Sequence, residues 1–89
     1  MLHDDNELLE LHYLEKKVNP HLEESIRRVV LSNRFFGSNI EEIEVIVQED
    51  LIQKIKILMT NDAVINRFLN MNSNRIKDLI YWYYYFDEG

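Results

Sequence analysis

The feature that most constrains this chain is its scarcity of residues that break helices. Its 89 residues include only two glycines and one proline. A strand-and-turn protein of this length relies on many such residues at its turns. The sequence therefore favours an all-α fold, and its length is sufficient for one domain with a single core.

Five helical segments are predicted from apolar spacing and from start and stop signals. They are expected at residues 6–18, 20–36, 38–59, 63–70 and 74–86. Asn19 and Pro20 are interpreted as a turn, because Asn is a favourable N-cap and Pro suits the first helical position. Gly37 is expected to end the second helix in a left-handed conformation. We predict a single domain over 1–89, a compact bundle of four to five helices around a long central helix.

The segment 38–59 is predicted to be that central helix. Ser38 and Glu41 have the spacing of a capping box, in which each satisfies a backbone N–H at the helix start. Apolar residues occupy most of its sides, which is typical of a buried helix. A break near Asp50 remains open, since Asp50 is also a suitable N-cap.

Helical spacing predicts which apolar residues of the first three segments face the core. The expected inward residues are Leu8, Leu11, Leu14 and Val18, then Leu22, Ile26, Val29 and Phe36, then Ile40, Ile43, Val47, Leu51, Ile55 and Leu58. On the outer side, Glu23 with Arg27 and Glu24 with Arg28 are spaced to form i,i+4 ion pairs. A third such pair joins Asp50 and Lys54.

Six consecutive aromatic residues, YWYYYF at 81–86, form the most unusual stretch of the chain. If Ile76 and Ile80 face the core, Tyr83 does too, with Phe86 and Tyr84 at the edges of that face. Tyr81, Trp82 and Tyr85 are then left pointing outward. Leu31 and Phe35 are similarly left on the outer side of the segment 20–36. One small core does not account for these five side chains.

The charge of the chain is unevenly distributed. Residues 1–50 hold twelve acidic and five basic residues, a net charge of −7, whereas residues 51–89 hold four and five, a net charge of +1. An acidic first half repels nucleic acid and suits a basic protein partner. The same carboxylates are also compatible with a protein that imitates phosphate charge and occupies a nucleic-acid-binding groove.

The principal functional hypothesis is a small acidic protein–protein interaction module, such as a regulator, inhibitor or assembly factor. It would dock an apolar and aromatic surface on a partner or on a second copy, which makes a homo-oligomer an expected state. Aromatic residues dominate the energetics of protein interfaces. The predicted partner-binding residues are Tyr81, Trp82, Tyr85, Phe35 and Leu31. The competing interpretation is a compact bundle with some exposed apolar residues and no partner.

The alternative function is DNA binding by a helix-turn-helix. In the stretch 61–80, Ile65, Leu69, Ile76 and Ile80 have the spacing of two packed helices, with Asn70 in the turn and Met71 buried beneath it. The side chains that would then face a major groove are Asn72, Ser73, Asn74, Arg75 and Lys77. The net charge of −6 opposes binding to phosphate, and Asp78 lies on the recognition helix.

No catalytic, metal or membrane motif is found in the sequence. There is no cysteine, and His3, His12 and His21 are too far apart along the helices to converge on a metal, so we expect no enzyme activity and no cofactor. The longest apolar run, 79–86, is far shorter than the ~20 residues of a membrane-spanning helix. The N-terminus is acidic where a signal peptide is basic. We expect a cytoplasmic or intracellular protein.

Overall fold

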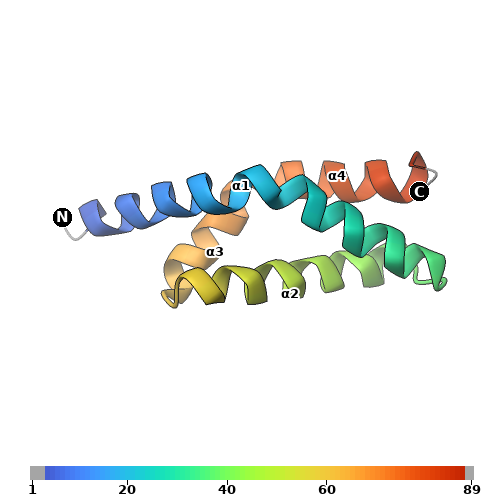
Figure 1. The fold of residues 1–89 in the computed structure, drawn as a ribbon, viewed down its shortest axis with the longest axis horizontal. Coiled ribbons are helices and arrows are strands. Elements are labelled where there is room, and N and C mark those ends of the chain that lie inside the picture. The colour runs from blue at the N-terminus through green and yellow to red at the C-terminus, as the bar shows by residue number, and fades with distance from the viewer. Residues whose placement is uncertain (1–3, 88–89) are drawn as a thin grey trace.

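Four helices account for nearly all of residues 4–87, the part of the chain that the computed structural model describes (Figure 1). They are α1 (Asp4–Phe35), α2 (Ile40–Leu58), α3 (Asp62–Met71) and α4 (Ser73–Tyr85). The prediction of an all-α bundle is confirmed. The bundle is elongated, with extents of 47 × 18 × 17 Å.

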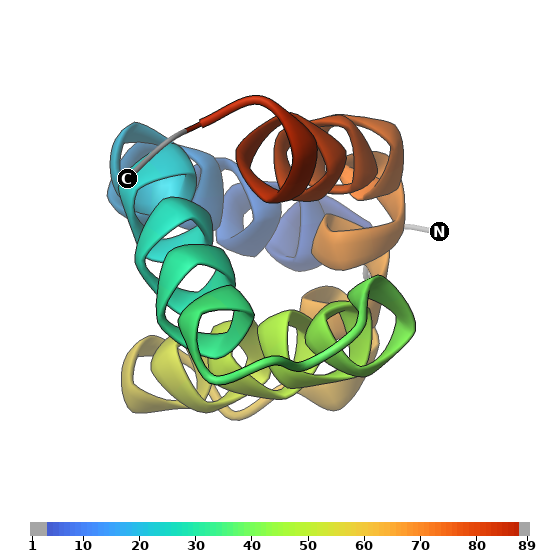
Figure 2. The ribbon, with the colours of Figure 1, turned by 90° about the vertical axis from the view of Figure 1, so that its right-hand side faces the viewer.

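The helices run back and forth along the long axis (Figure 1). α1 spans most of the molecule, α2 returns alongside it, and the short α3 crosses over to α4, which runs back towards the end of α1. Every pair of helices is in contact, and α1 has the most extensive contacts. The C-terminal ends of α1 and α4 therefore lie at the same end of the bundle, next to the start of α2 (Figure 2).

The predicted turn at Asn19 and Pro20 was wrong, because α1 is continuous through Pro20. Proline removes one backbone hydrogen bond and crowds the carbonyl of Lys16, four residues earlier, which bends a helix rather than necessarily ending it. Pro20 and Lys16 are both exposed, so water can reach this side of the helix. The axis of α1 changes direction near its middle, which lets its two halves follow different neighbours (Figure 1).

α2 begins one residue later than the predicted capping box. Asn39, not Ser38, is the N-cap, and its side chain accepts a 2.8 Å hydrogen bond from the N–H of Glu42. The carboxylate of Glu42 accepts one in return from the N–H of Asn39. α2 continues without a break at Asp50, where the predicted ion pair with Lys54 is present at 2.9 Å.

All four helices contribute to one apolar core. Its buried residues are Leu11, Leu14, Leu22, Ile26, Val30, Ile43, Val47, Leu51, Ile55, Val64, Ile65, Phe68, Leu69, Ile76, Ile80 and Tyr83. Most of the predicted stripes are confirmed, but Leu8, Phe36 and Leu58 were wrongly placed inside. Each of these three lies near the end of a helix, where the neighbouring helices no longer cover it. α2 also exposes Val45 and Ile57, so it is not buried on all sides.

Candidate interaction surface

The aromatic residues of α4 divide between the core and the surface, as helical spacing predicts. Tyr83 is buried beside Ile80, while Tyr81, Trp82 and Tyr85 are 48%, 56% and 60% exposed. Two consecutive residues of a helix diverge by about 100°. A run of six aromatics on one helix therefore cannot all reach a core that lies on one side.

Phe86 belongs to the exposed group, so its predicted place at the edge of the inward face was wrong. It is 67% exposed and lies just beyond the last residue of α4. Its ring is 5.2 Å from the ring of Trp82, one helical turn earlier. Tyr81 and Tyr85 form a second pair at the same spacing, edge to face at 6.0 Å. Such ring pairs hold each other in place while leaving their outer surfaces open.

Two more exposed rings end α1. Phe35 and Phe36 are 82% and 80% exposed, and they contact each other edge to face at 5.2 Å. Gly37, with a φ of 89°, then turns the chain towards α2, as predicted for a helix-ending glycine. α1 ends at these phenylalanines, and no neighbouring helix covers their rings.

Tyr84 connects the two groups of rings. Its hydroxyl lies 3.4 Å from the carbonyl oxygen of Ser38, in the turn that follows Phe36, and its ring contacts the ring of Tyr85 at 4.9 Å. Figure 2 looks directly at this end of the bundle. We use the name aromatic end for the six exposed rings gathered there: Phe35, Phe36, Tyr81, Trp82, Tyr85 and Phe86.

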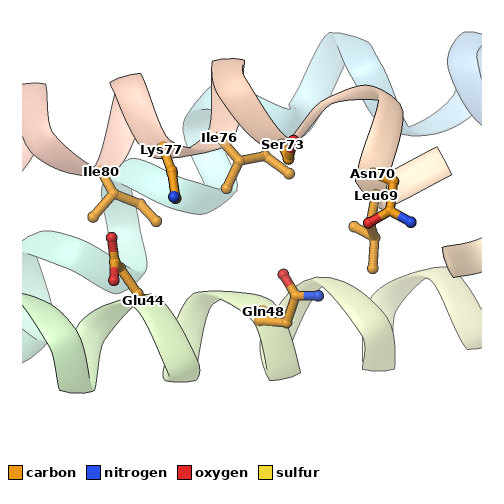
Figure 3. Close-up of a pocket in the computed structure, with 8 residues that line it drawn as sticks. All are labelled: Glu44, Gln48, Leu69, Asn70, Ser73, Ile76, Lys77 and Ile80. Carbon is orange, nitrogen blue, oxygen red and sulfur yellow. The ribbon is translucent and has the colours of Figure 1, made fainter. Parts of the chain in front are cut away.

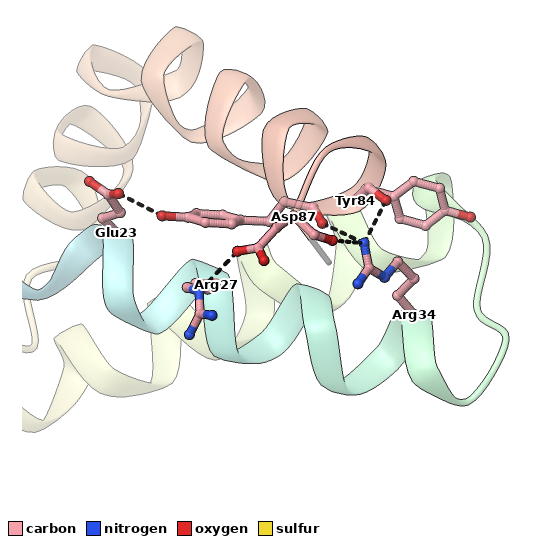
Figure 4. A network of polar contacts seen from close by, with 6 residues as sticks. Glu23, Arg27, Arg34, Tyr84 and Asp87 are labelled. Atoms are coloured by element: carbon pink, nitrogen blue, oxygen red, sulfur yellow. Dashed lines mark hydrogen bonds and ion pairs between the residues drawn. The ribbon is translucent and has the colours of Figure 1, made fainter. Parts of the chain in front are cut away.

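Arg34 fixes the end of α1 against the end of α4 (Figure 4). Its guanidinium donates hydrogen bonds to the carbonyls of Tyr83, Tyr84 and Asp87 at 2.9, 3.0 and 2.6 Å. The last carbonyls of a helix have no partner within the helix, and a cation there also complements the helix dipole. Arg34 thus caps α4 from a different helix and holds the aromatic end in one arrangement.

A second polar network supports Tyr83 from α1 (Figure 4). The Tyr83 hydroxyl donates a 2.5 Å hydrogen bond to Glu23, and this bond, helped by burial, raises the pKa of Tyr83 to about 12. Arg27 bonds Asp87 at 3.0 Å, and this contact raises the pKa of Arg27. The predicted Glu23–Arg27 pair is replaced by these two long-range contacts, whereas the predicted Glu24–Arg28 pair is present at 3.5 Å.

Four of the five predicted partner-binding residues lie in the aromatic end. Leu31 is half-buried on α1, one turn before Phe35. Phe36 and Phe86 were missed, since helical spacing placed both near the core. Gly37, the helix-ending residue directly after Phe36, was the one local indication that this ring lies at the end of a helix.

The residues of the predicted helix-turn-helix lie on two helices joined by a single residue. Asn72 links α3 to α4 and donates a side-chain hydrogen bond to the carbonyl of Phe68 at 2.9 Å. Asn70 is helical rather than in a turn, and Met71 is exposed, so both of these assignments were wrong. A helix-turn-helix has a turn of three to four residues. The other predicted DNA-facing side chains, Ser73, Asn74, Arg75 and Lys77, are exposed on α4.

Two of the grooves among the described residues have a volume of about 180 Å³ each. The first lies between α2 and the α3–α4 junction, with a floor of Leu69, Ile76 and Ile80 and a polar rim that includes Glu44 and Lys77 (Figure 3). The second lies between α1 and α2, with an apolar floor and a rim of Lys17, His21, Ser25 and Lys54. Both are smaller than the ~300–1,000 Å³ of typical small-molecule sites.

Metal sites and membrane-spanning helices are absent from residues 4–87. His12 and His21 are exposed on α1, whereas His3 lies outside the described residues. No three His, Asp or Glu side chains of the described part gather closely enough to hold a metal ion. None of its helices has both the length and the apolar character needed to cross a membrane.

The chain was compared with known proteins in three ways. No family model, no curated protein and no solved structure matches it.

Proposed function

We propose that this protein is a small acidic interaction module that binds another protein chain through the aromatic end. The observation that supports the proposal is that six large rings lie exposed towards one end of the bundle, as three contacting pairs: Phe35 with Phe36, Tyr81 with Tyr85, and Trp82 with Phe86. None of the six side chains is charged. Exposed rings gathered in this way, rather than scattered singly, are typical of interaction sites.

The composition of the surface fits this role. Trp and Tyr are the residues most enriched among those that dominate binding energy, because a rigid ring buries much area at little entropic cost. The ring pairs and the Arg34 cap hold the surface in place before a partner arrives, which reduces the ordering cost of binding. The module acts passively, as a regulator, inhibitor or assembly factor, by occupying a surface on its partner.

A hydrophobic fluorescent dye tests whether the aromatic end is open and apolar. At a protein concentration low enough to keep chains from associating, we expect the natural chain to bind the dye, and the combined changes Tyr85→Ala and Phe35→Ala to remove most of that binding. Tyr13→Ala is the matched control, because Tyr13 is an exposed tyrosine on α1 outside the aromatic end. Equal dye binding by all three proteins would contradict the proposal.

The DNA-binding alternative is separated from this proposal by a second pair of substitutions. Arg75→Ala with Lys77→Ala removes the cationic side chains of the predicted recognition helix without touching the aromatic end. We expect no retention of any duplex by the natural chain at low salt, and no effect of this pair on dye binding. Retention that these substitutions abolish would favour a DNA-binding regulator instead.

A further inference from the structure

We infer that the partner at the aromatic end is a second copy of this chain, so that the protein is a dimer joined end to end through these rings. This inference rests on the proposed function and names its partner. Three properties of the aromatic end support it: its area, its chemistry and its position. The charge of the chain then supplies a test that separates a second copy from a basic partner.

The exposed area of the rings matches what one side of a stable dimer needs. An aromatic side chain presents roughly 150–250 Å². Weighted by exposed fractions that run from 48% at Tyr81 to 82% at Phe35, the six rings leave on the order of 800 Å² open to solvent. A standard-size interface buries about 800 Å² on each partner. The aromatic end therefore reaches the area of one half of an interface when all six rings are covered.

The chemistry of the aromatic end is self-complementary. In a two-fold interface the same patch of both copies is in contact, so the patch has to be complementary to itself. Aromatic rings pack against one another edge to face, as Tyr81 and Tyr85 already do within one copy. The hydroxyls of Tyr81 and Tyr85 each donate and accept hydrogen bonds, so a tyrosine hydroxyl of one copy is a suitable partner for a tyrosine hydroxyl of the other. A surface made of one charge sign would repel its copy, but the six rings carry no charge.

The position of the patch makes the assembly close at two. The aromatic end occupies one end of a molecule 47 Å long, where α1 and α4 finish together. When a patch pairs with the same patch of a second copy, both patches are buried and neither remains free to bind a third chain. The opposite end, formed by the α2–α3 connection and the start of α1, exposes the aliphatic side chains of Leu8, Leu9, Ile57 and Leu58, but among residues 4–87 it has no pair of contacting rings. Because the rings pair with the rings of a second copy, the expected particle is a dimer.

The net charge of −6 predicts how salt affects this dimer. Two acidic copies repel each other, and salt screens that repulsion over a Debye length of about 8–10 Å at physiological ionic strength. Exposed Glu41 and Glu42 lie at the start of α2, close to the aromatic end. Association of two copies should therefore strengthen as salt is added. A basic partner steered by the same acids would bind more weakly in salt.

Trp82 allows the natural chain to be tested without any substitution. It is the only tryptophan, and it lies in the aromatic end, so its fluorescence reports on that surface alone. We expect its emission to shift to the blue as protein concentration rises, with the same midpoint as a monomer–dimer transition measured by sedimentation. Both transitions should move to lower protein concentration in higher salt. A monomer at every concentration, with Trp82 emission unchanged, would overturn the inference.

Single cysteines then locate the contact. The natural chain has none, so Glu41→Cys and Asn66→Cys each introduce one thiol without removing a ring, the first at the exposed start of α2 beside the aromatic end and the second on the exposed side of α3. Each variant is mixed with a short thiol cross-linker at the concentration where the natural chain is dimeric. We expect a cross-linked dimer from Glu41→Cys and little from Asn66→Cys. The reverse pattern would place the dimer contact elsewhere and overturn the inference.

The two proposals fail in different ways. Tyr85→Ala should weaken dimerisation about tenfold or more, whereas Tyr13→Ala should change it less than about twofold. Circular dichroism of both variants shows whether each remains folded. If the natural chain is monomeric but its aromatic end still binds the dye, the second copy is excluded and the proposed function stands. If the chain is monomeric and binds no dye, both proposals fall.

Discussion

The hydroxyl of Tyr83 on α4 and the carboxylate of Glu23 on α1 form a 2.5 Å hydrogen bond between residues sixty positions apart. Tyr83→Phe keeps the buried ring and removes only this bond. Glu23 is exposed and can be solvated again, so we expect a loss of about 1 kcal/mol in the free energy of unfolding, measured in denaturant. Tyr81→Phe, which alters an exposed tyrosine two residues earlier on the outward side of α4, should change stability by less than about 0.5 kcal/mol. Equal effects of the two changes would contradict this assignment.

The same bond predicts how stability falls in alkali. Unfolded Tyr83 loses its proton near pH 10. In the folded protein the pKa of Tyr83 is raised to about 12. Between these values the unfolded state binds fewer protons than the folded state, so the Tyr83 contribution is complete below pH 10 and is lost as pH rises to about 12.

Comparing the natural chain with Tyr83→Phe isolates this effect, because other groups titrate in both proteins. The stability difference between them should be constant from neutral pH to about 10 and shrink above that. Thermal or denaturant unfolding across this pH range provides the measurement. A difference that grows with pH would show that the Tyr83 pKa is shifted in the other direction.

Arg34→Ala should loosen the end of α4. The change leaves the carbonyls of Tyr83, Tyr84 and Asp87 without their guanidinium donor, and we expect a loss of about 1.5–3 kcal/mol. Arg28→Ala is the matched control on the same helix, since Arg28 makes only an exposed ion pair with Glu24 and should cost about 0–1 kcal/mol. Hydrogen exchange at the last turn of α4 should accelerate in Arg34→Ala alone.

Two phenylalanines should differ greatly in their effect on stability. Phe68 on α3 is fully buried, and Phe68→Ala should cost about 3–5 kcal/mol through lost burial and the cavity left behind. Phe35 is 82% exposed, so Phe35→Ala should change the stability of one folded chain by less than about 0.5 kcal/mol. These values are to be measured at a protein concentration low enough to suppress association. A large loss from Phe35→Ala under those conditions would mean that this ring supports the fold.

Local patterns were sufficient to predict most of the fold. The spacing of Ile43, Val47, Leu51 and Ile55 identified both α2 and its buried face, and Ile76 and Ile80 did the same for α4. Pro20 was misread because the sequence does not show whether the carbonyl that proline leaves unpaired can reach water. That depends on which side of α1 the neighbouring helices cover.

The candidate surface was predictable only in part. Outward placement of Tyr81, Trp82 and Tyr85 follows from helical geometry once Ile76 and Ile80 face inward. The exposure of Phe36 and Phe86 depends on where two helices end relative to each other, which spacing within one helix cannot give. The bonds from Arg34 and Glu23 to α4 carry no local signal, because each joins residues roughly fifty or sixty positions apart.

The bend at Pro20 has a further consequence for how the protein opens. Helix formation is cooperative, and a missing backbone hydrogen bond in the middle of α1 weakens the coupling between its two halves. The first half is tied to α3 by contacts such as Arg67 with Glu7 and Asn61 with Glu10, while the second half is tied to α4 by Arg27 and Arg34. We therefore expect residues 4–19, although they bury Leu11 and Leu14, to unfold locally before the rest of the bundle and to leave the aromatic end intact.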